Sequence, residues 1–386
     1  MIEKILVVDD ETDLELLIKQ KFRKQIREGE FNFVFAGNGL EALAKLIEHP
    51  DISIILTDIN MPEMDGLTLL LKVNELKNPS LKVVIVSAYG DMDNIRTAMN
   101  RGAYDFLTKP VDFTDLEITI KKTIEEVGQL RKSLQEHKKL VSIERDLNIA
   151  RDIQLAILPK VFPPFPDKKE FDIFGFMTAA KSVGGDFFDF FLIDENRLGF
   201  VIGDVSGKGV PAAIFMAVSR TLIRATGLKG MPPAECLAYA NRLLKNESTS
   251  SMFVTVFYGI LDIRTGVVEY SNGGHNQPII IKNDGTVEMM SVPSSMVLGI
   301  TDDAAYETGS FKMNSGDIFI LYTDGVTEAF NKSDELYSET RLIETLKRTR
   351  NHNIPEIVKT VVDDVNNFSK DVPQTDDITT LALIYN

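Results

Sequence analysis

The chain has 386 residues, 44% of them hydrophobic and 26% charged, which is the composition of a globular protein with room for two or three domains. Its net charge of −15 disfavours direct binding to DNA and to anionic membranes. No apolar run approaches the roughly 18 residues of a membrane span, and the single cysteine, Cys236, excludes an internal disulfide and fits a reducing compartment, so we expect a cytoplasmic protein.

Residues 1–120 alternate short apolar runs with amphipathic stretches. The first run, Ile5–Val8, begins so early that it leaves no room for a signal peptide. Four further strand-like runs follow: Phe33–Phe35, Ile52–Thr57, Val83–Ser87 and Tyr104–Leu107. Helical patterns lie between them, at Leu40–Ile47, Leu67–Leu76 and Ile95–Asn100. This alternation predicts a parallel sheet with helices on both faces, whose functional crevice lies at the carboxyl ends of the strands.

The segment from Phe113 to Leu158 predicts one long helix. It has no proline and one glycine, Gly128, and apolar residues recur in it at steps of three and four: Ile120, Ile124, Val127, Leu130, Leu134, Leu140, Ile143, Leu147 and Ala150. The phase of the repeat slips near 137–144. We expect a homodimeric coiled coil, with a solvated connecting helix as the alternative. Pro159 and the prolines that follow it end the helix.

Residues 168–386 differ in character and predict an α+β domain. Six strand patterns occur there: Leu198–Ile202, Phe253–Leu261, Val267–Ser271, Pro278–Ile281, Ile318–Tyr322 and Thr379–Ile384. They surround three helical stretches, Ala212–Thr226, Ala234–Lys245 and Ile354–Phe368. The turn sequence Asn283-Asp284-Gly285 is typical of a hairpin and favours antiparallel sheets.

Residues suited to phosphoryl chemistry follow the strands of the first region. They are Asp9, Asp10, Asp58, Ser87 and Lys109. Neighbouring carboxylates repel one another unless a cation lies among them, and oxygen ligands favour Mg²⁺. Ser87 and Lys109 could contact phosphate oxygens, and Asp58 would be the nucleophile that forms an acyl phosphate. Helix capping is the alternative role for any single aspartate of this set.

Residues 1–125 resemble the receiver family of response regulators, which has the CheY-like fold. The resemblance rests on Asp9-Asp10, on Thr57–Gly66 around Asp58, on Ser87-Ala88 and on Lys109-Pro110. It implies a five-stranded parallel sheet in the order 2-1-3-4-5 and phosphorylation of Asp58 by a histidine kinase. It also implies Mg²⁺ held by Asp9, Asp10, Asp58 and the Asn60 carbonyl. Phe106 matches the family's switch aromatic and would swing inward when Ser87 moves.

A second set of aspartates lies in the C-terminal region, each near the end of an apolar run. They stand in Gly185-Asp186, Gly203-Asp204, Thr323-Asp324-Gly325 and Thr375-Asp376-Asp377. Four separated carboxylates can hold two divalent ions about 4 Å apart, which would clamp a phosphate and activate a water. Such a site hydrolyses a phosphoester by in-line attack without a covalent intermediate. Turn formation is the alternative for any one Asp-Gly pair.

This set resembles the PPM family of metal-dependent serine/threonine phosphatases, in its bacterial SpoIIE-like branch, over residues 145–386. Two further segments match it: 147–154 leading into Leu158-Pro159, and Asn272–Pro278. The resemblance implies an antiparallel β-sandwich flanked by helices. It implies two Mn²⁺ or Mg²⁺ ions held by Asp186, Asp204, Asp324, Asp376 and Asp377, with the Val205 carbonyl nearby. It leaves the phosphate-binding residue open, because no arginine matches the one of the eukaryotic branch, and it leaves His275 as a turn residue or a site residue.

Three other motifs fail on their neighbours. Gly184-Gly185-Asp186-Phe187 is similar to a diguanylate cyclase signature but lacks its Glu. Cys236 and Arg242 have the spacing of cysteine-based phosphatases, yet helix formers without glycine stand between them. Gly207-Lys208 resembles a nucleotide-binding loop, but Gly209 replaces the required hydroxyl residue.

We therefore predict a receiver domain at 1–122, a helical linker at 123–158 and a phosphatase domain at 159–386. Phosphorylation of Asp58 would control dephosphorylation of a protein. The resemblance implies that the substrate is a phosphorylated, STAS-type antagonist of an anti-sigma factor. The alternatives are a non-catalytic adaptor with a phosphatase-like fold and a nucleotide cyclase, which the missing Glu disfavours.

Overall fold

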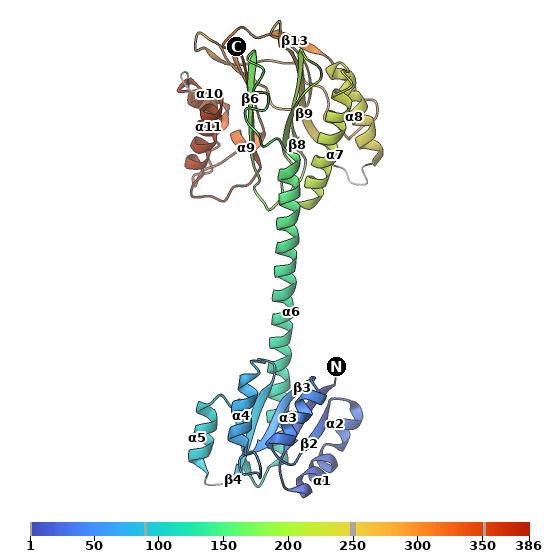
Figure 1. The fold of residues 1–386 in the computed structure, drawn as a ribbon, viewed down its shortest axis with the longest axis vertical. Coiled ribbons are helices and arrows are strands. Elements are labelled where there is room, and N and C mark those ends of the chain that lie inside the picture. The colour runs from blue at the N-terminus through green and yellow to red at the C-terminus, as the bar shows by residue number, and fades with distance from the viewer. Residues whose placement is uncertain (1, 89–90, 248–251, 350–352) are drawn as a thin grey trace. The chain divides into compact units, whose positions relative to one another are not determined.

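The computed structural model describes residues 2–88, 91–247, 252–349 and 353–386. The chain divides into two compact units, Met1–Ile143 and Glu144–Asn386, and helix α6 (Phe113–Ile157) continues from the first into the second (Figure 1). The predicted linker, 123–158, lies almost wholly within this one helix. Its limits as a separate segment stay a prediction.

The first unit contains the predicted five-stranded parallel sheet, in the order β2-β1-β3-β4-β5. Its strands are β1 (Glu3–Val8), β2 (Phe31–Ala36), β3 (Ile52–Asp58), β4 (Lys82–Ala88) and β5 (Asp105–Lys109). The helices between them are α1 (Thr12–Lys21), α2 (Arg23–Glu28), α3 (Gly39–Glu48), α4 (Gly66–Glu75) and α5 (Met92–Asn100). The sequence patterns missed α1 and α2, because helix α1 buries a single residue, Ile18, and so has little apolar periodicity.

Strand β3 shows the burial that is typical of a parallel sheet covered on both faces. All seven of its residues are buried, so it shows no alternation of apolar and polar residues. Ile55 packs into one core and Ile54 and Leu56 into the other, on opposite faces of the sheet. The strand ends at Asp58. Helix α4 begins so close to it that a side chain on Gly66 would lie 2.1 Å from the Asp58 carbonyl oxygen. This arrangement fixes Asp58 at the carboxyl edge of the sheet.

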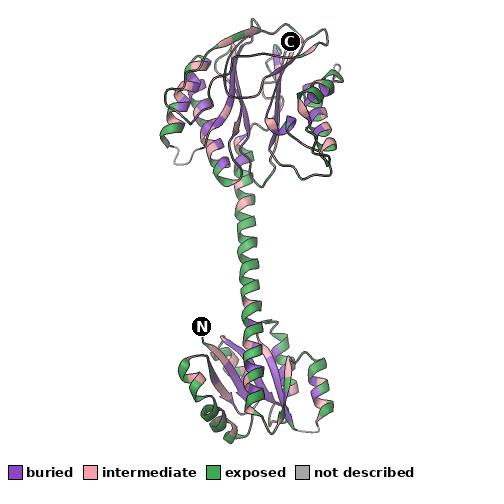
Figure 2. Ribbon diagram, turned by 180° about the vertical axis from the view of Figure 1, so that it is seen from behind, coloured by how far each residue is buried: buried purple, intermediate pink, exposed green. Residues whose placement is uncertain are grey.

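Helix α6 presents two different faces along its length. Ile120 and Val127 are fully buried in the first unit, whereas Leu140 is 60% exposed and Ile143 is 46% exposed (Figure 2). At about 100° per residue, Leu140 lies roughly 220° around the helix axis from Val127. The slip in the apolar repeat is therefore a change of face, and the two halves of the pattern do not form one continuous seam. The first unit covers the first half of the helix, so only residues beyond it are open to a partner helix.

The second unit consists of two five-stranded antiparallel sheets, in the orders β13-β10-β9-β8-β7 and β12-β11-β14-β15-β6. The first sheet is formed by β7 (Phe187–Leu192), β8 (Arg197–Val205), β9 (Val254–Asp262), β10 (Val267–Gly273) and β13 (Gly309–Lys312). The second is formed by β6 (Phe171–Thr178), β11 (Ile279–Ile281), β12 (Val287–Met289), β14 (Ile318–Tyr322) and β15 (Ile378–Tyr385). The hairpin predicted at 283–285 joins β11 to β12. The predicted β-sandwich is thus confirmed.

Helices cover the outer faces of both sheets. Figure 1 shows α7 (Val210–Gly227) and α8 (Pro233–Glu247) on one side, and α10 (Ser338–Lys347) and α11 (Ile354–Phe368) on the other; the short α9 (Asp324–Thr327) follows β14. The main core contains Phe187 and Phe200 of the first sheet and Phe319 of the second. None of the helices in the described part of the chain has both the length and the apolar character that a membrane crossing requires.

Candidate functional site

The first candidate site lies at the carboxyl edge of the parallel sheet. Asp9 and Asp10 follow β1, and Asp58 ends β3 beside it. One carboxylate oxygen from each of the three lies within 4.8 Å of the others. In the described part of the chain, no other group of three carboxylate, histidine or cysteine ligands comes this close together. The sequence prediction that these three aspartates meet agrees with this geometry, and three carboxylates at this spacing suit one hard divalent cation.

Lys109, at the end of β5, supplies positive charge to the same edge. Its Nζ lies 2.6 Å from Asp58 Oδ2, 3.0 Å from Asp9 Oδ2 and 3.3 Å from Glu11 Oε1. Partial burial opposes the charged ammonium, but the hydrogen bonds to Asp58 and Asp9 prevail and raise the pKa of Lys109. Burial raises the pKa of Asp9. The ammonium therefore stays charged and balances part of the carboxylate charge.

The backbone holds the other oxygen of Asp58. Asp58 Oδ1 accepts hydrogen bonds from the N–H groups of Ile59 (2.6 Å) and Asn60 (3.3 Å). Ser87 is fully buried at the end of β4 and its hydroxyl donates to Asp91 Oδ2 at 3.3 Å. Phe106, on β5, is 37% exposed. In this conformation the Ser87 hydroxyl is bonded to Asp91 and the Phe106 side chain is partly exposed.

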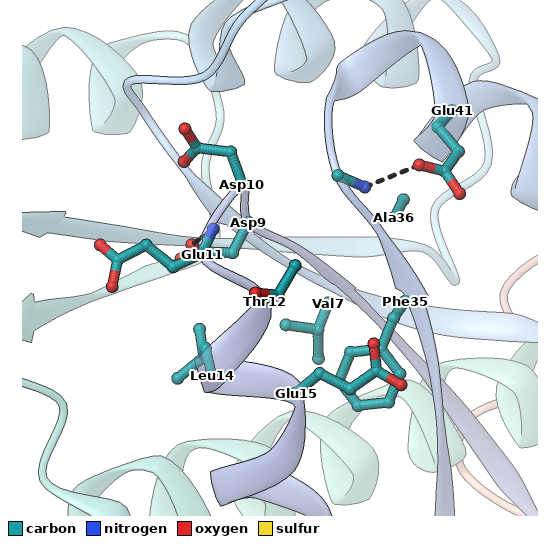
Figure 3. A pocket seen from close by; sticks show the side chains of 11 residues that line it. Val7, Asp9, Asp10, Glu11, Thr12, Leu14, Glu15, Phe35, Ala36 and Glu41 are labelled. Carbon is teal, nitrogen blue, oxygen red and sulfur yellow. Dashed lines mark hydrogen bonds between the residues drawn. The ribbon is translucent and has the colours of Figure 1, made fainter.

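A pocket of about 270 Å³, lined by Asp9 and Asp10 of the three aspartates, lies between α1, α3 and the strands β1 and β2 (Figure 3). Its polar lining is acidic: Asp9, Asp10, Glu11, Glu15 and Glu41. Figure 3 shows the Glu41 carboxylate turned to the backbone N–H of Gly37, which donates to it at 2.8 Å. The negative lining extends the cation-attracting field of the site outward from Asp9.

The second candidate site lies in the C-terminal unit, at the ends of strands from both sheets. Its most buried member is Asp186, which is 1% exposed and directly precedes β7. Asp186 Oδ2 accepts hydrogen bonds from the hydroxyls of Thr323 (2.7 Å) and Thr379 (2.6 Å). Burial and the charges of Asp204 and Asp377 raise the pKa of Asp186 well above its usual range. A buried carboxylate with this pKa needs a proton or a cation at neutral pH.

Three further aspartates extend the series. Burial and the neighbouring Asp324 raise the pKa of Asp204, in β8, to about 7. Burial and the neighbouring Asp376 raise the pKa of Asp324, the first residue of α9. The charge of each carboxylate thus raises the pKa of the one before it in the series Asp186, Asp204, Asp324 and Asp376. The series is longer than the compact receiver trio, which fits two cations better than one.

Asp376 and Asp377 have different surroundings although they are adjacent. Asp376 is partly exposed, and Lys208 Nζ lies 2.7 Å from its Oδ2. Asp377 is buried, and its two oxygens accept the backbone N–H groups of Ala180 (2.8 Å) and Gly185 (2.6 Å). These hydrogen bonds occupy the Asp377 carboxylate with the loop that carries Asp186. Its role as a metal ligand stays a prediction.

Glycines allow the loops of the second site to approach one another. A side chain on Gly184 would lie 2.4 Å from Asp377 Oδ2, and one on Gly325 would lie 1.9 Å from the Asp377 carbonyl oxygen. A side chain on Gly185 would lie 2.9 Å from the Val205 carbonyl oxygen. The glycines beside the aspartates are therefore required by close backbone packing, which also places the Val205 carbonyl against the loop of Asp186.

The segment Asn272–His275 forms a tight turn beside Asp204. The Asn272 side chain accepts from the backbone N–H of His275 (2.7 Å) and donates to its carbonyl oxygen (3.0 Å). His275 Nδ1 is hydrogen-bonded to the Thr255 hydroxyl at 2.9 Å, and Thr255 pairs with Asp204 between β9 and β8. Burial lowers the pKa of His275 to about 4, so its imidazole is neutral at physiological pH. His275 therefore adds no charge next to the strand pair that carries Asp204.

The donors of the second site fit divalent cations. All the side-chain donors are carboxylate oxygens, and a backbone carbonyl, that of Val205, lies beside them. Among the described residues, the one cation that forms an ion pair with Asp186, Asp204, Asp324 or Asp376 is Lys208. One ammonium leaves most of the negative charge uncompensated, and oxygen donors with excess negative charge suit Mg²⁺ or Mn²⁺.

The structure accounts for two of the motifs that the sequence analysis rejected. Cys236 lies fully buried in α8, and burial raises the pKa of its thiol to about 12, so it cannot act as a thiolate nucleophile near neutral pH. Gly184-Gly185-Asp186-Phe187 belongs to the carboxylate site itself, where Asp186 is hydrogen-bonded to two threonines. Neither motif forms a separate site.

Sequence reasoning missed residues that hold the site together. Gln154, near the end of α6, is 5% exposed; its Nε2 donates to the Gly184 carbonyl (2.6 Å) and its Oε1 accepts from the Gly184 N–H (3.0 Å). The sequence patterns also assign no role to Thr323 and Thr379, which bond to Asp186. A polar residue within the apolar repeat of α6 was the available signal for Gln154, since buried polar groups need partners.

Comparison with known proteins follows the division of the chain. A model of the family described as stage II sporulation protein E (SpoIIE) matches residues 194–386, which is half of the chain, and a response regulator receiver domain model matches residues 5–121. Protein IcfG of Synechocystis sp. (strain ATCC 27184 / PCC 6803 / Kazusa) is 31% identical over 269 residues, covering 62% of this chain; the chain spans only 42% of IcfG.

Two further similarities each cover 64% of the chain. Phosphoserine phosphatase RsbU of Bacillus subtilis (strain 168) is 27% identical over 254 residues, covering 64% of this chain and 74% of that protein. The solved SiaA-PP2C domain of Pseudomonas aeruginosa superimposes with a TM-score of 0.57 at 20% identity, covering 64% of this chain and 99% of that domain. At this identity the structural match shows a common fold.

Proposed function

The chain belongs to the SpoIIE family and carries a response regulator receiver domain, and on this premise we propose that phosphorylation of Asp58 controls a metal-dependent phosphoserine/phosphothreonine protein phosphatase in the C-terminal unit. The observation that carries the proposal is the series of aspartates, Asp186, Asp204, Asp324 and Asp376, whose charges one lysine cannot balance. The similarity to a phosphoserine phosphatase supports the choice of substrate group.

In the phosphatase site, Asp186, Asp204, Asp324 and Asp376 would hold two Mn²⁺ or Mg²⁺ ions, with the Val205 carbonyl as a further ligand. When bound, the cations supply positive charge for the phosphate and lower the pKa of the attacking water. Thr323 and Thr379 hold Asp186 Oδ2 in place, and Asp377 fixes the loop before it. The chain thus positions its carboxylates through hydrogen bonds that already exist.

In the receiver site, Asp9, Asp10, Asp58 and the Asn60 carbonyl would hold Mg²⁺. An Asp58 oxygen would attack the phosphorus of a phosphohistidine on a partner kinase, so that the P–N bond breaks and an acyl phosphate forms. The Lys109 ammonium, 2.6 Å from Asp58 Oδ2, would then pair with a phosphoryl oxygen. Ser87 would turn from Asp91 toward the phosphoryl group, and Phe106 would move inward.

We place the substrate among phosphorylated antagonists of anti-sigma factors with a STAS-type fold, which makes this protein a member of a partner-switching pathway. The similarity to phosphoserine phosphatase RsbU supports this assignment. The net charge of −15 agrees with a protein partner in preference to DNA.

Helix α6 offers the route for regulation. Its first part is buried in the receiver through Ile120 and Val127, and Gln154 near its end holds Gly184 of the loop that carries Asp186. A shift or rotation of α6 on phosphorylation would therefore act on the Gly184 backbone and change the position of Asp186. Two hydrogen bonds from one buried side chain make this connection direct.

The exposed part of α6 would pair with the same helix of a second copy. Leu140 and Ile143 are 60% and 46% exposed and lie about 60° apart around the helix axis, so they form an exposed apolar strip that a partner helix could cover. Replacing Leu140 with Asp should shift the sedimentation of the full chain from dimer to monomer, whereas Ser142→Asp, at an exposed polar position about 200° away on the helix, should not. A wild-type monomer at micromolar concentration would refute the dimer.

Phosphatase activity is tested by the release of orthophosphate from a phosphoserine peptide in the presence of Mn²⁺, with Asp204→Asn as the inactive control. Release that requires Mn²⁺ and Asp204 would support the enzyme. No release from any phosphoserine substrate with either cation would favour the alternative function, a non-catalytic adaptor.

A further inference from the structure

Lys208 lies at the second site but has no part in the proposed binding of the two cations. It lies between β8 and α7 in Gly207-Lys208-Gly209, four residues after Asp204. Its Nζ forms an ion pair with Asp376 Oδ2 at 2.7 Å and donates to the Thr375 carbonyl oxygen. Its charge also lowers the pKa of Asp324, against the larger effects that raise it. The ammonium is therefore electrostatically part of the carboxylate site.

The loop around Lys208 is loosely packed. Gly207 and Gly209 have φ values of +87° and +84°, and a side chain built on either would meet no atom within 4 Å. The Lys208 side chain is 37% exposed. Among the described residues its oxygen partners both belong to the 375–376 segment, so the ammonium can leave Asp376 without disturbing a packed core.

The pairing with Asp376 competes directly with a divalent cation. An ammonium and a divalent cation on one carboxylate repel each other, and the divalent cation binds oxygen ligands more strongly. Cation binding would therefore release Lys208 at the edge of the site. A phosphate group held by the cations would lie close to this edge, and an ammonium on a flexible stem is a common partner for phosphate oxygens.

Building on the proposed phosphatase function, we propose that Lys208 exchanges Asp376 for the phosphate of the substrate when the cations bind. The residue has two positions: in the cation-free protein it neutralises Asp376, and in the loaded protein it anchors the phosphate. This assigns the phosphate-binding role that no arginine of the chain matches by position, and it makes Lys208 a substrate-binding residue.

The test compares Lys208→Met, Lys208→Arg and a control, Lys282→Met, in the full chain. Lys282 forms an exposed ion pair with Glu288 in the β11–β12 hairpin and takes no part in the site. Calorimetry measures Mn²⁺ binding first and then orthophosphate binding to the Mn²⁺-loaded proteins. We expect Lys208→Met to bind Mn²⁺ at least as tightly as the wild type and orthophosphate roughly tenfold or more weakly, with Lys208→Arg intermediate and Lys282→Met unchanged.

Kinetics with a phosphoserine peptide give a second readout, a rise of KM larger than the fall of kcat in Lys208→Met. Unchanged orthophosphate affinity in Lys208→Met would overturn the proposal, and so would a loss of Mn²⁺ affinity, which would make Lys208 a tether of the 375–376 segment. Orthophosphate binding does not depend on turnover. A wild-type protein that binds orthophosphate through Lys208 but hydrolyses no phosphoserine would contradict the proposed function and leave the phosphate site in place.

Discussion

The carboxylate of Asp377 accepts the backbone N–H of Gly185 at 2.6 Å, although the two residues are 192 positions apart in the sequence. This hydrogen bond joins the start of β15 to the loop before β7 and thereby fixes Asp186. The neighbouring Asp376 points elsewhere, to Lys208. The two adjacent aspartates thus have different roles: Asp377 holds the loop before β7, and Asp376 presents a negative charge to Lys208.

We predict that Asp377→Asn destabilises the cation-free protein by about 1–3 kcal/mol. The asparagine NH₂ group would face a backbone N–H that now donates to a carboxylate oxygen, and this donor would lose its acceptor. Asp376→Asn should change this stability much less, since its side chain is partly exposed, and should weaken Mn²⁺ binding instead. Urea unfolding without cations and calorimetry with Mn²⁺ distinguish the two. Equal destabilisation by both substitutions would argue against the separation of roles.

The stability of the cation-free protein should depend on Asp204. Its folded-state pKa of about 7 lies above the ordinary value of 3.8, so the folded protein holds this proton more tightly than the unfolded chain. The contribution of the protonated Asp204 to the free energy of unfolding is therefore fully present below pH 3.8 and is lost as the pH rises through 7. The difference in unfolding free energy between the wild type and Asp204→Asn should move in favour of the variant over this range. Saturating Mn²⁺ should reverse the trend, because the cation replaces the proton; a difference that does not vary with pH would contradict this assignment.

Much of both sites could be predicted from the sequence because their key residues lie at strand ends. Asp9, Asp58 and Lys109 each follow an apolar run, and parallel strands bring such ends to one edge. The hydrogen bonds of Thr323 and Thr379 to Asp186 could not be predicted, since they depend on how two antiparallel sheets stack. Strand β7 was missed because the buried Asp189 interrupts its run of phenylalanines, so the segment shows neither a continuous apolar run nor a regular alternation.

Phe106 offers a direct view of the receiver switch. The chain contains no tryptophan, so Phe106→Trp introduces a single indole at a position that is 37% exposed. We predict that its fluorescence shifts to the blue when a small phosphodonor and Mg²⁺ phosphorylate Asp58, because the ring moves from water into the protein. Adding Asp58→Asn to this variant should abolish the shift. A shift that persists without Asp58 would have to come from Mg²⁺ alone.

The connection between α6 and the phosphatase site is tested at Gln154. Replacing it with Leu removes both hydrogen bonds to the Gly184 backbone and leaves a buried N–H and a buried carbonyl without partners. We predict a lower basal phosphatase rate and a loss of the response to Asp58 phosphorylation. Gln135→Leu, an exposed position on the same helix, is the matched control and should retain both. A Gln154→Leu protein that still responds fully would place the route of regulation elsewhere.

The central claim is that the phosphorylation state of Asp58 sets the rate of the phosphatase. The most direct measurement is the rate of orthophosphate release from a phosphoserine protein by the full chain with Mn²⁺, before and after loading Asp58 with an acyl-phosphate mimic, in the wild type and in Asp58→Asn. We predict that loading changes the rate of the wild type and leaves that of Asp58→Asn unchanged. Equal rates for loaded and unloaded wild type would contradict the claim.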